Sequence, residues 1–122
     1  MEANPLVDLS KAFAVNIITL CNEIKENRRG NSLINQLLRC GTSIGANIHE
    51  SNYASSRGDF INKLQIAMKE CYETEYWLDI FCEAKVLTQE EHRRLYSQCS
   101  KIRKILTASI TTAKQNAAKE DC

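Results

Sequence analysis

The side chains with the clearest chemical potential are two pairs of carboxylates, each spaced three residues apart: Glu23 with Glu26, and Glu70 with Glu73. Residues three apart share one face of a helix, so each pair could hold a divalent cation for nucleotide hydrolysis. An all-helical hydrolase of that type needs a further Glu-x-x-Asp pair, whereas Glu75 and Asp79 are four apart here. Because such pairs arise readily in glutamate-rich helices, a carboxylate-dependent nucleotide hydrolase remains only the alternative interpretation.

Other catalytic chemistry finds little support in the sequence. The two histidines, His49 and His92, have no partner at metal-ligand spacing. There is no glycine-rich phosphate loop, and the serines and six cysteines have no recognisable base partner. We therefore predict a protein that is not an enzyme and that has no cofactor, no catalytic residues and no metal site.

Basic side chains are the better candidates for a binding function. Four of them project from one predicted helix, away from its apolar stripe, and two more form a small cluster in a loop; they are Arg93, Arg94, Lys101 and Lys104, with Arg28 and Arg29. Such a face either binds the phosphates of RNA or DNA or is simply solvated. No aromatic residues alternate with these basic side chains, so stacking on nucleobases is not indicated. Binding should therefore tolerate any nucleotide sequence.

The net charge of +1 conceals an asymmetry along the chain. Residues 1–49 sum to +1, residues 50–85 to −3 and residues 86–122 to +3. The total excludes a strongly basic protein of the histone kind. The uneven distribution is compatible with electrostatic steering or self-association.

Helical periodicity explains how these side chains are positioned. Apolar residues recur every three or four positions, as in the stripe Leu33, Leu37, Ile44 and Ile48, and no segment alternates as a strand would. Ser56 is a good N-cap, Thr88 to Glu91 forms a capping box, and Gly30 is a plausible C-cap. The whole chain, residues 1–122, is predicted to be one all-α domain, an antiparallel up-down-up-down four-helix bundle with helices at about 6–26, 32–54, 56–84 and 88–112 and a fraying polar tail.

Two glycines, Gly41 and Gly45, lie inside the second predicted helix. Each destabilises a helix by about 1 kcal/mol relative to alanine, so a compensating interaction is expected. Their spacing of four places them on one side, where the missing Cβ atoms allow another helix to approach closely. That neighbour could belong to the same bundle or to another subunit.

A polar ridge runs along the outer side of the same helix, formed by Gln36, Arg39, Ser43, Asn47 and Glu50. The third helix carries a second line behind its core stripe, formed by Ile66, Glu73, Trp77 and Ile80. An exposed tryptophan and two isoleucines are not needed on the outside of a lone bundle, so we predict a subunit interface there. Glu75 falls on the core stripe and needs a partner or an exit to water; Arg39 is the candidate partner for either Glu75 or Glu73.

The segments QLLRCGTSIGANIHES and GDFINKLQIAMKECYETEYWL resemble the four-helix proteins encoded in intervening sequences of bacterial 23S ribosomal RNA genes. They are also similar to the accessory variability protein of diversity-generating retroelements. The matching positions are Arg39, Ser43, Ile44, Asn47, Ile48, Glu50, Phe60, Leu64, Ala67, Glu73 and Glu75. Ser51 stands where the family pattern has glycine, which predicts a differently shaped turn after the second helix.

The resemblance implies a four-helix protomer in a ring-like homopentamer, without a demonstrated enzymatic role. The retroelement relatives bind nucleic acid and a reverse transcriptase. We therefore expect a non-enzymatic, oligomeric module whose partner is RNA, DNA or another protein. No apolar run approaches the ~20 residues of a membrane helix, and the N-terminus does not resemble a signal peptide. The expected location is the cytoplasm, with the cysteines acting as free thiols in the core.

Overall fold

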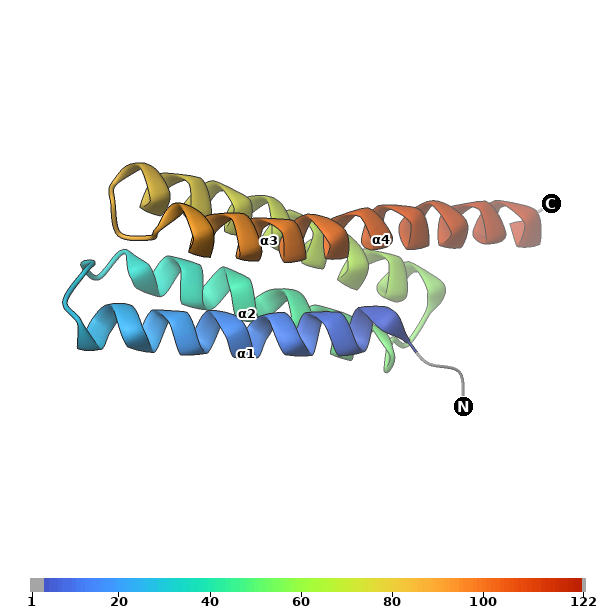
Figure 1. Cartoon of the computed structure of the whole chain (residues 1–122). Coiled ribbons are helices and arrows are strands. Elements are labelled where there is room, and N and C mark those ends of the chain that lie inside the picture. Colours follow the sequence, from blue (N-terminus) through green and yellow to red (C-terminus); the bar gives the residue numbers. More distant parts are fainter. Residues whose placement is uncertain (1–3, 122) are drawn as a thin grey trace.

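The computed structural model of the chain describes residues 4–121, and the side chains of residues 4–119. It confirms the predicted all-α fold. The helices are α1 (Pro5–Glu26), α2 (Ile34–Ser51), α3 (Arg57–Glu83) and α4 (Gln89–Asp121), with no strand within residues 4–121. Each helix packs on the next and α4 closes back onto α1, while the Cα atoms of the diagonal pairs stay more than 8 Å apart. Figure 1 shows this up-down arrangement, with the termini of the chain at one end.

The core forms where the four apolar stripes meet. Its fully buried side chains include Phe13, Ile17, Leu37, Ile44, Leu64, Leu78, Leu95, Ile102 and Leu106. Leu33 is an exception to the predicted stripe, because 48% of its surface is exposed where it precedes α2. Leu9 and Phe60 are only partly buried and pack on the edge of the core.

Helix α2 is shorter than predicted at both ends. The backbone N–H groups of Ile34, Asn35 and Gln36 donate to carbonyls three residues back, so a tight turn precedes the regular helix. Three further bonds of this type follow Ser51, which is buried and donates its hydroxyl to the Ile48 carbonyl at 2.6 Å. The turn therefore forms without a left-handed residue, although the family pattern has glycine at this position.

Two predicted N-caps are confirmed. The Ser56 hydroxyl accepts from the Asp59 backbone N–H at 3.0 Å at the start of α3. At α4, the Thr88 hydroxyl accepts from the Glu91 N–H at 3.0 Å, and the Glu91 carboxylate accepts from the Thr88 N–H at 2.9 Å. These reciprocal bonds satisfy backbone donors that a helix start leaves without partners.

The predicted C-cap at Gly30 is wrong. Helix α1 is capped by Asn27, and the left-handed residue that follows is Arg28, with φ of 55°. Gly30 instead permits a close approach, since a Cβ there would lie 3.2 Å from side-chain atoms of both Ile24 and Val86. Small size, and not positive φ, is what this position requires.

The predicted end of the last helix is also wrong, because α4 continues to Asp121 and projects beyond the other helices (Figure 1). Residues 113–119 are mainly alanine, lysine and glutamine, which favour helix. Extending an existing helix also avoids the unfavourable nucleation step. Ile110 still reaches the core, with 6% of its surface exposed.

Candidate functional site

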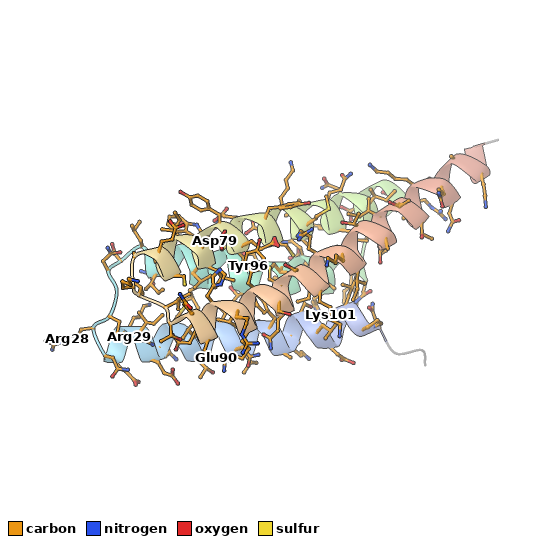
Figure 2. The ribbon with its side chains drawn as sticks, turned by 45° about the horizontal axis from the view of Figure 1, so that its top comes forward. Arg28, Arg29, Asp79, Glu90, Tyr96 and Lys101 are labelled. Carbon is orange, nitrogen blue, oxygen red and sulfur yellow. The ribbon has the colours of Figure 1, made fainter. Side chains whose placement is uncertain are left out.

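The outer side of α4 carries a basic face, defined by Arg93, Arg94, Lys101 and Lys104, all of them exposed. From His92 to Lys119 the helix has seven basic residues and no acidic residue. Successive members of the basic face follow the side of the helix opposite Leu95, Ile102 and Leu106, which are buried. Figure 2 shows Lys101 on α4, some distance from Glu90 near the start of the helix.

Most of this charge has no partner in the protein. Among the described residues, Arg94, Lys101 and Lys104 form no ion pair. Arg93 pairs with Glu90 at 2.5 Å, and this hydrogen bond raises the pKa of Arg93 above its usual value. Both side chains are largely exposed, so the pair contributes little to stability.

Shallow hollows between α1 and α4 border the basic face. Arg94 lines one of about 280 Å³ together with Asn16, Thr19, Leu20 and Glu23. Lys101 lines a smaller one of about 150 Å³, where Asn16 donates to Gln98 across the helices at 3.2 Å. Polar amides therefore lie beside the cations; Glu23 lines the Arg94 hollow, and the Lys101 hollow is lined by no acidic residue among those described.

The largest hollow, of about 610 Å³, lies between Phe60 and the part of α4 from Lys104 to Asn116. Its remaining lining is Ile105, Ala108, Ser109, Thr112 and Ala113. It is wide and contains no carboxylate, thiol or imidazole, so its size does not indicate catalysis.

The two loop arginines have different environments. Arg29 donates to the Val86 carbonyl and to the Glu91 carboxylate, each at 3.2 Å, and so connects the α1–α2 loop with the start of α4. Arg28 is exposed and forms no ion pair among the described residues. Figure 2 shows both at the loop end of the bundle. Arg29 therefore has an evident structural role, while Arg28 remains available to a ligand.

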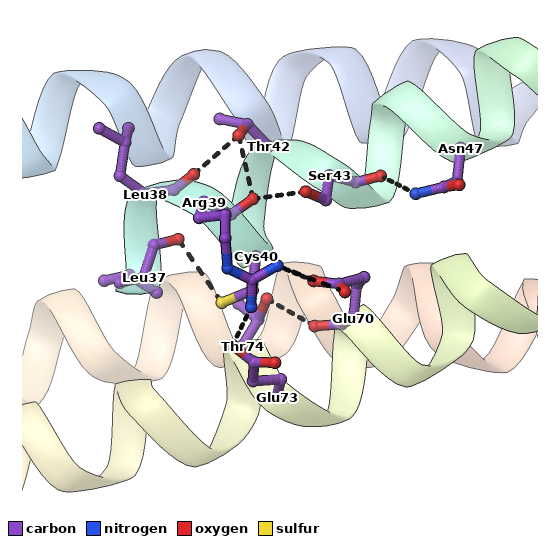
Figure 3. Close-up of polar contacts among 10 residues, drawn as sticks. All are labelled: Leu37, Leu38, Arg39, Cys40, Thr42, Ser43, Asn47, Glu70, Glu73 and Thr74. Atoms are coloured by element: carbon purple, nitrogen blue, oxygen red, sulfur yellow. Dashed lines mark hydrogen bonds and ion pairs between the residues drawn. The ribbon is translucent and has the colours of Figure 1, made fainter. Parts of the chain in front are cut away.

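Charges on the polar ridge of α2 are used within the bundle, as Figure 3 shows for Arg39. Its guanidinium pairs with Glu70 at 3.2 Å and with Glu73. Glu50, at the other end of the ridge, pairs with Lys63 at 3.2 Å. The ridge thus lies along the seam between α2 and α3.

Two neutral residues of the ridge, Ser43 and Asn47, form hydrogen bonds with the backbone of their own helix. The Ser43 hydroxyl donates to the Arg39 carbonyl at 2.7 Å, and the Asn47 amide donates to the Ser43 carbonyl at 2.9 Å (Figure 3). Both bonds span four residues along α2. These side chains therefore do not need a second subunit to satisfy them.

The glycines on the opposite flank of α2 pack against α1. A Cβ at Gly41 would lie 3.0 Å from side-chain atoms of the buried Ile17. A Cβ at Gly45 would lie 3.3 Å from the Ser10 carbonyl oxygen. Of the two neighbours left open by the sequence, the structure places one from the same bundle against this pair.

Glu75 is buried, as its position on the core stripe requires, but its partner is not Arg39. The Arg103 Nε lies 2.9 and 3.0 Å from the two carboxylate oxygens, and the Ser100 hydroxyl donates to Oε1 at 3.0 Å. The predicted Arg39 bond to Glu75 is therefore wrong, whereas the alternative bond to Glu73 is present. The position of Glu75 on the core stripe indicated that it needs a partner. The register in which α3 and α4 pack decides that the partner is Arg103 of α4.

Arg103 also covers an aromatic ring. Its guanidinium carbon lies 5.0 Å from the centroid of the Tyr72 ring, at cation–π distance. Glu75, Arg103, Ser100 and Tyr72 thus form one cluster across α3 and α4. Sequence reasoning did not single out Arg103, Ser100 or Tyr72.

The second apolar line on α3 is partly covered within the protomer. Ile66, Trp77 and Ile80 are all of intermediate exposure. Trp77 stacks on Phe81 with ring centroids 5.5 Å apart and packs against the core. The presence of this tryptophan can therefore be explained without a second subunit.

On α3, the carboxylates that a nucleotide hydrolase would use already have partners in the protein. Glu70 and Glu73 pair with Arg39, and Asp79 approaches His92 at 2.7 Å. The other carboxylate pair lies on α1, which is diagonally opposite α3 in the bundle. Within the described residues, no three histidine, cysteine or acidic side chains are arranged to hold a metal ion.

Four cysteines are buried thiols, as predicted: Cys21, Cys40, Cys71 and Cys99. Burial raises the pKa of both Cys21 and Cys40 to about 11. A hydrogen bond with Cys71, together with burial, raises the pKa of Cys99. Thiols of high pKa are poor nucleophiles at neutral pH, so they fill space in the core.

Taken together, these features define an all-α bundle with internally paired charges on one seam and, among the described residues, three cations without an ion pair on the basic face of α4. The chain matches the 23S rRNA-intervening sequence protein family over residues 2–108, and it belongs to that family. The match ends before the last turns of α4. No curated protein matches the chain.

A solved structure supports the same assignment. It is that of a protein with unknown function from the S23 ribosomal protein family of Bacteroides thetaiotaomicron. The two chains are 42% identical with a TM-score of 0.84, over 86% of this chain and 97% of the other. In the part of this chain that the structure describes, no helix is both long and apolar enough to cross a membrane.

Proposed function

We propose that this protein binds nucleic acid through phosphate contacts made by the basic face of α4, and that it acts by binding, without catalysis. The observation that carries the proposal is that Arg94, Lys101 and Lys104, on a stretch of helix without acidic residues, form no ion pair within the part of the chain that the structure describes. A cation that already has an internal partner gains less from a phosphate. Three unpaired cations on one exposed face can each release a counterion from a polyphosphate.

A role in assembly is part of the proposal. We expect a homo-oligomer, most simply the pentamer implied by the family resemblance, with Trp77 near the interface. A ring would repeat the basic face and so increase the avidity for one long polyanion. Trp77→Glu should lower the solution mass measured by light scattering while the far-ultraviolet helical signal is kept; a wild-type monomer at micromolar concentration would contradict this part.

Several observations favour binding over the alternative of carboxylate-dependent nucleotide hydrolysis. On α3, Glu70 and Glu73 are paired with Arg39, and Asp79 is in contact with His92. The α1 pair lies on the helix diagonally opposite α3 in the bundle. Release of phosphate or pyrophosphate from nucleotides with Mg²⁺ or Mn²⁺ would overturn the non-enzymatic proposal.

Charge reversal tests the binding surface directly. Lys101→Glu with Lys104→Glu should abolish the anisotropy change of a fluorescein-labelled oligonucleotide at low salt. The matched control is Lys11→Glu with Lys25→Glu, two exposed lysines of α1 that form no ion pair among the described residues. Both double variants change the net charge equally, so a loss confined to the α4 variant supports a located site.

Two outcomes would reject this proposal. One is equal loss of binding in both double variants, which would indicate only a nonspecific effect of net charge. The other is no binding by the wild-type protein at low salt. In the second case the basic face is a solvated surface, and another protein becomes the preferred partner.

A further inference from the structure

The strongest feature that the proposed function leaves unused is the exposed aromatic ring next to the basic face. Tyr72 on α3 has 54% of its surface exposed, although Arg103 from α4 lies over its ring at 5.0 Å. With one ring face covered by the guanidinium, the exposed area falls on the opposite face and the outer edge. An aromatic face held beside cations is a stacking surface for a nucleobase.

Two further cations come from positions close to Tyr72 and Arg103 on α3 and α4. Lys69 precedes Tyr72 by three residues on α3, so the two side chains share one helix face. Across the seam, the Thr107 hydroxyl lies 3.5 Å from the Met68 sulfur, which places Met68–Tyr72 against Arg103–Thr107 of α4. Lys104 follows Arg103 on the outer side, and neither Lys69 nor Lys104 forms an ion pair among the described residues.

The ring is also held in place. Arg103 is fixed by two contacts from its Nε to the buried Glu75 carboxylate, at 2.9 and 3.0 Å. That carboxylate is in turn hydrogen-bonded by Ser100 at 3.0 Å. A guanidinium held in this way fixes one face of Tyr72, so a base stacking on the other face meets a preorganised surface.

A second tyrosine on the same helix provides a contrast. Tyr76 is equally exposed, at 56%, but packs edge-on against Trp77 and has no arginine over its ring. Its neighbours three residues away on either side, Glu73 and Asp79, are both acidic. Those of Tyr72 are Lys69 and Glu75, and the Glu75 carboxylate is paired with Arg103. Acidic groups repel a phosphate backbone, so of these two exposed tyrosines Tyr72 is the better placed to meet a nucleic acid.

We infer that the ligand of the basic face is single-stranded nucleic acid, with Tyr72 stacking one base while Lys69 and Lys104 contact the flanking phosphates. This inference rests on the proposed function and adds the strand class and a specific aromatic residue. A duplex keeps its bases stacked on one another and gives Tyr72 nothing to bind. Arg103 is a positioning residue in this arrangement.

The test is an anisotropy titration of fluorescein-labelled 12-mer oligonucleotides, a single-stranded oligothymidine and a duplex of mixed sequence, at low salt. The wild type should prefer the single strand. Tyr72→Ala should weaken single-strand binding by about five- to 150-fold, the range for loss of one base–aromatic stack, and leave duplex binding unchanged. Tyr72→Phe keeps the ring and should bind as the wild type does.

Tyr76→Ala is the matched control and should change neither affinity. Tyr72→Leu, which keeps an apolar cover for Arg103 but has no π face, should lose single-strand binding as the alanine variant does while its circular dichroism stays helical. Unchanged single-strand affinity for Tyr72→Ala, equal losses at positions 72 and 76, or a wild-type preference for duplex would each overturn the inference and leave the phosphate site standing. No wild-type binding to either oligonucleotide would overturn both proposals.

Discussion

The ridge of α2 and the basic face of α4 are both rows of polar side chains on the outside of a helix, yet the protein uses them differently. On the ridge, Arg39 binds two glutamates of α3, and Glu50 binds Lys63. On the basic face, Lys101 and Lys104 form no ion pair with any residue that the structure describes. The difference arises from where carboxylates lie. Helix α3 presents glutamates to the ridge of α2, whereas residues 92–119 of α4, which carry the basic face, include no acidic residue. A row of charges therefore indicates a binding site only where the bundle itself leaves it unneutralised.

The largest expected effect comes from two adjacent cations of α4, one paired and one free. Arg103→Met leaves the carboxylate of Glu75, whose residue is 5% exposed, without its ion-pair partner. The loss should be about 3 kcal/mol, near the lower end for breaking a buried pair, since Arg103 keeps some exposure. Lys104→Met should change stability by less than about 0.5 kcal/mol. Urea unfolding followed by circular dichroism measures both, and equal effects would contradict the distinction.

A smaller loss is expected from the ridge. Arg39→Ala removes ion pairs with Glu70 and Glu73 from a half-exposed site, so the cost should be about 0.5 to 1 kcal/mol. Binding to an oligonucleotide should not change, because the Arg39 charge is already neutralised. If Arg39→Ala weakens binding as strongly as the double charge reversal on α4, then the ridge and the basic face belong to one site.

The salt dependence of binding should separate the two regions more finely. Lys104→Gln removes one phosphate contact, which should reduce the slope of log K against log salt by about 0.7 to 0.9. Arg39→Gln should leave the slope as it is in the wild type. Anisotropy titrations between about 50 and 200 mM salt give these slopes, and identical slopes for wild type and Lys104→Gln would exclude Lys104 from the contact set.

The smallest predicted effect concerns a pair at the loop end. Burial acts to raise the pKa of Glu91, but hydrogen bonds from Thr88 and Arg29 outweigh it and hold the pKa below the usual 4.5. A carboxylate with a lowered folded pKa stabilises the fold above about pH 4.5 and loses that contribution as the pH falls through the folded value. Glu91→Gln should therefore cost up to about 1 kcal/mol at pH 7 and nothing at pH 2.

Glu26→Gln serves as the control for that titration, since Glu26 is exposed and forms no ion pair among the described residues. Its unfolding midpoint should follow the wild type at both pH values. Equal stability of the wild type and Glu91→Gln at both pH values would show that Glu91 acts through the cap alone, because glutamine can also accept from the Thr88 N–H.

Much of the fold could be predicted from local signals in the sequence. The apolar period of three to four gave the helices, and the capping residues Ser56 and Thr88 placed the starts of α3 and α4 correctly. The end of α4 was missed because a polar, alanine-rich tail has the same composition whether it continues a helix or frays. Gly30 was misread because a small residue can serve either a left-handed turn or a close approach.

The sequence by itself determined most of the residues that lie inside, that Glu75 falls on the core stripe and needs a partner or an exit to water, and that basic residues collect after position 86. These follow from periodicity and composition, which are local properties. Only the tertiary structure decided that Arg103 and not Arg39 binds Glu75, that Gly41 and Gly45 face α1, and that Tyr72 lies beside the basic face. Such choices depend on the register of helices distant in sequence, and that register is set by packing of the whole core.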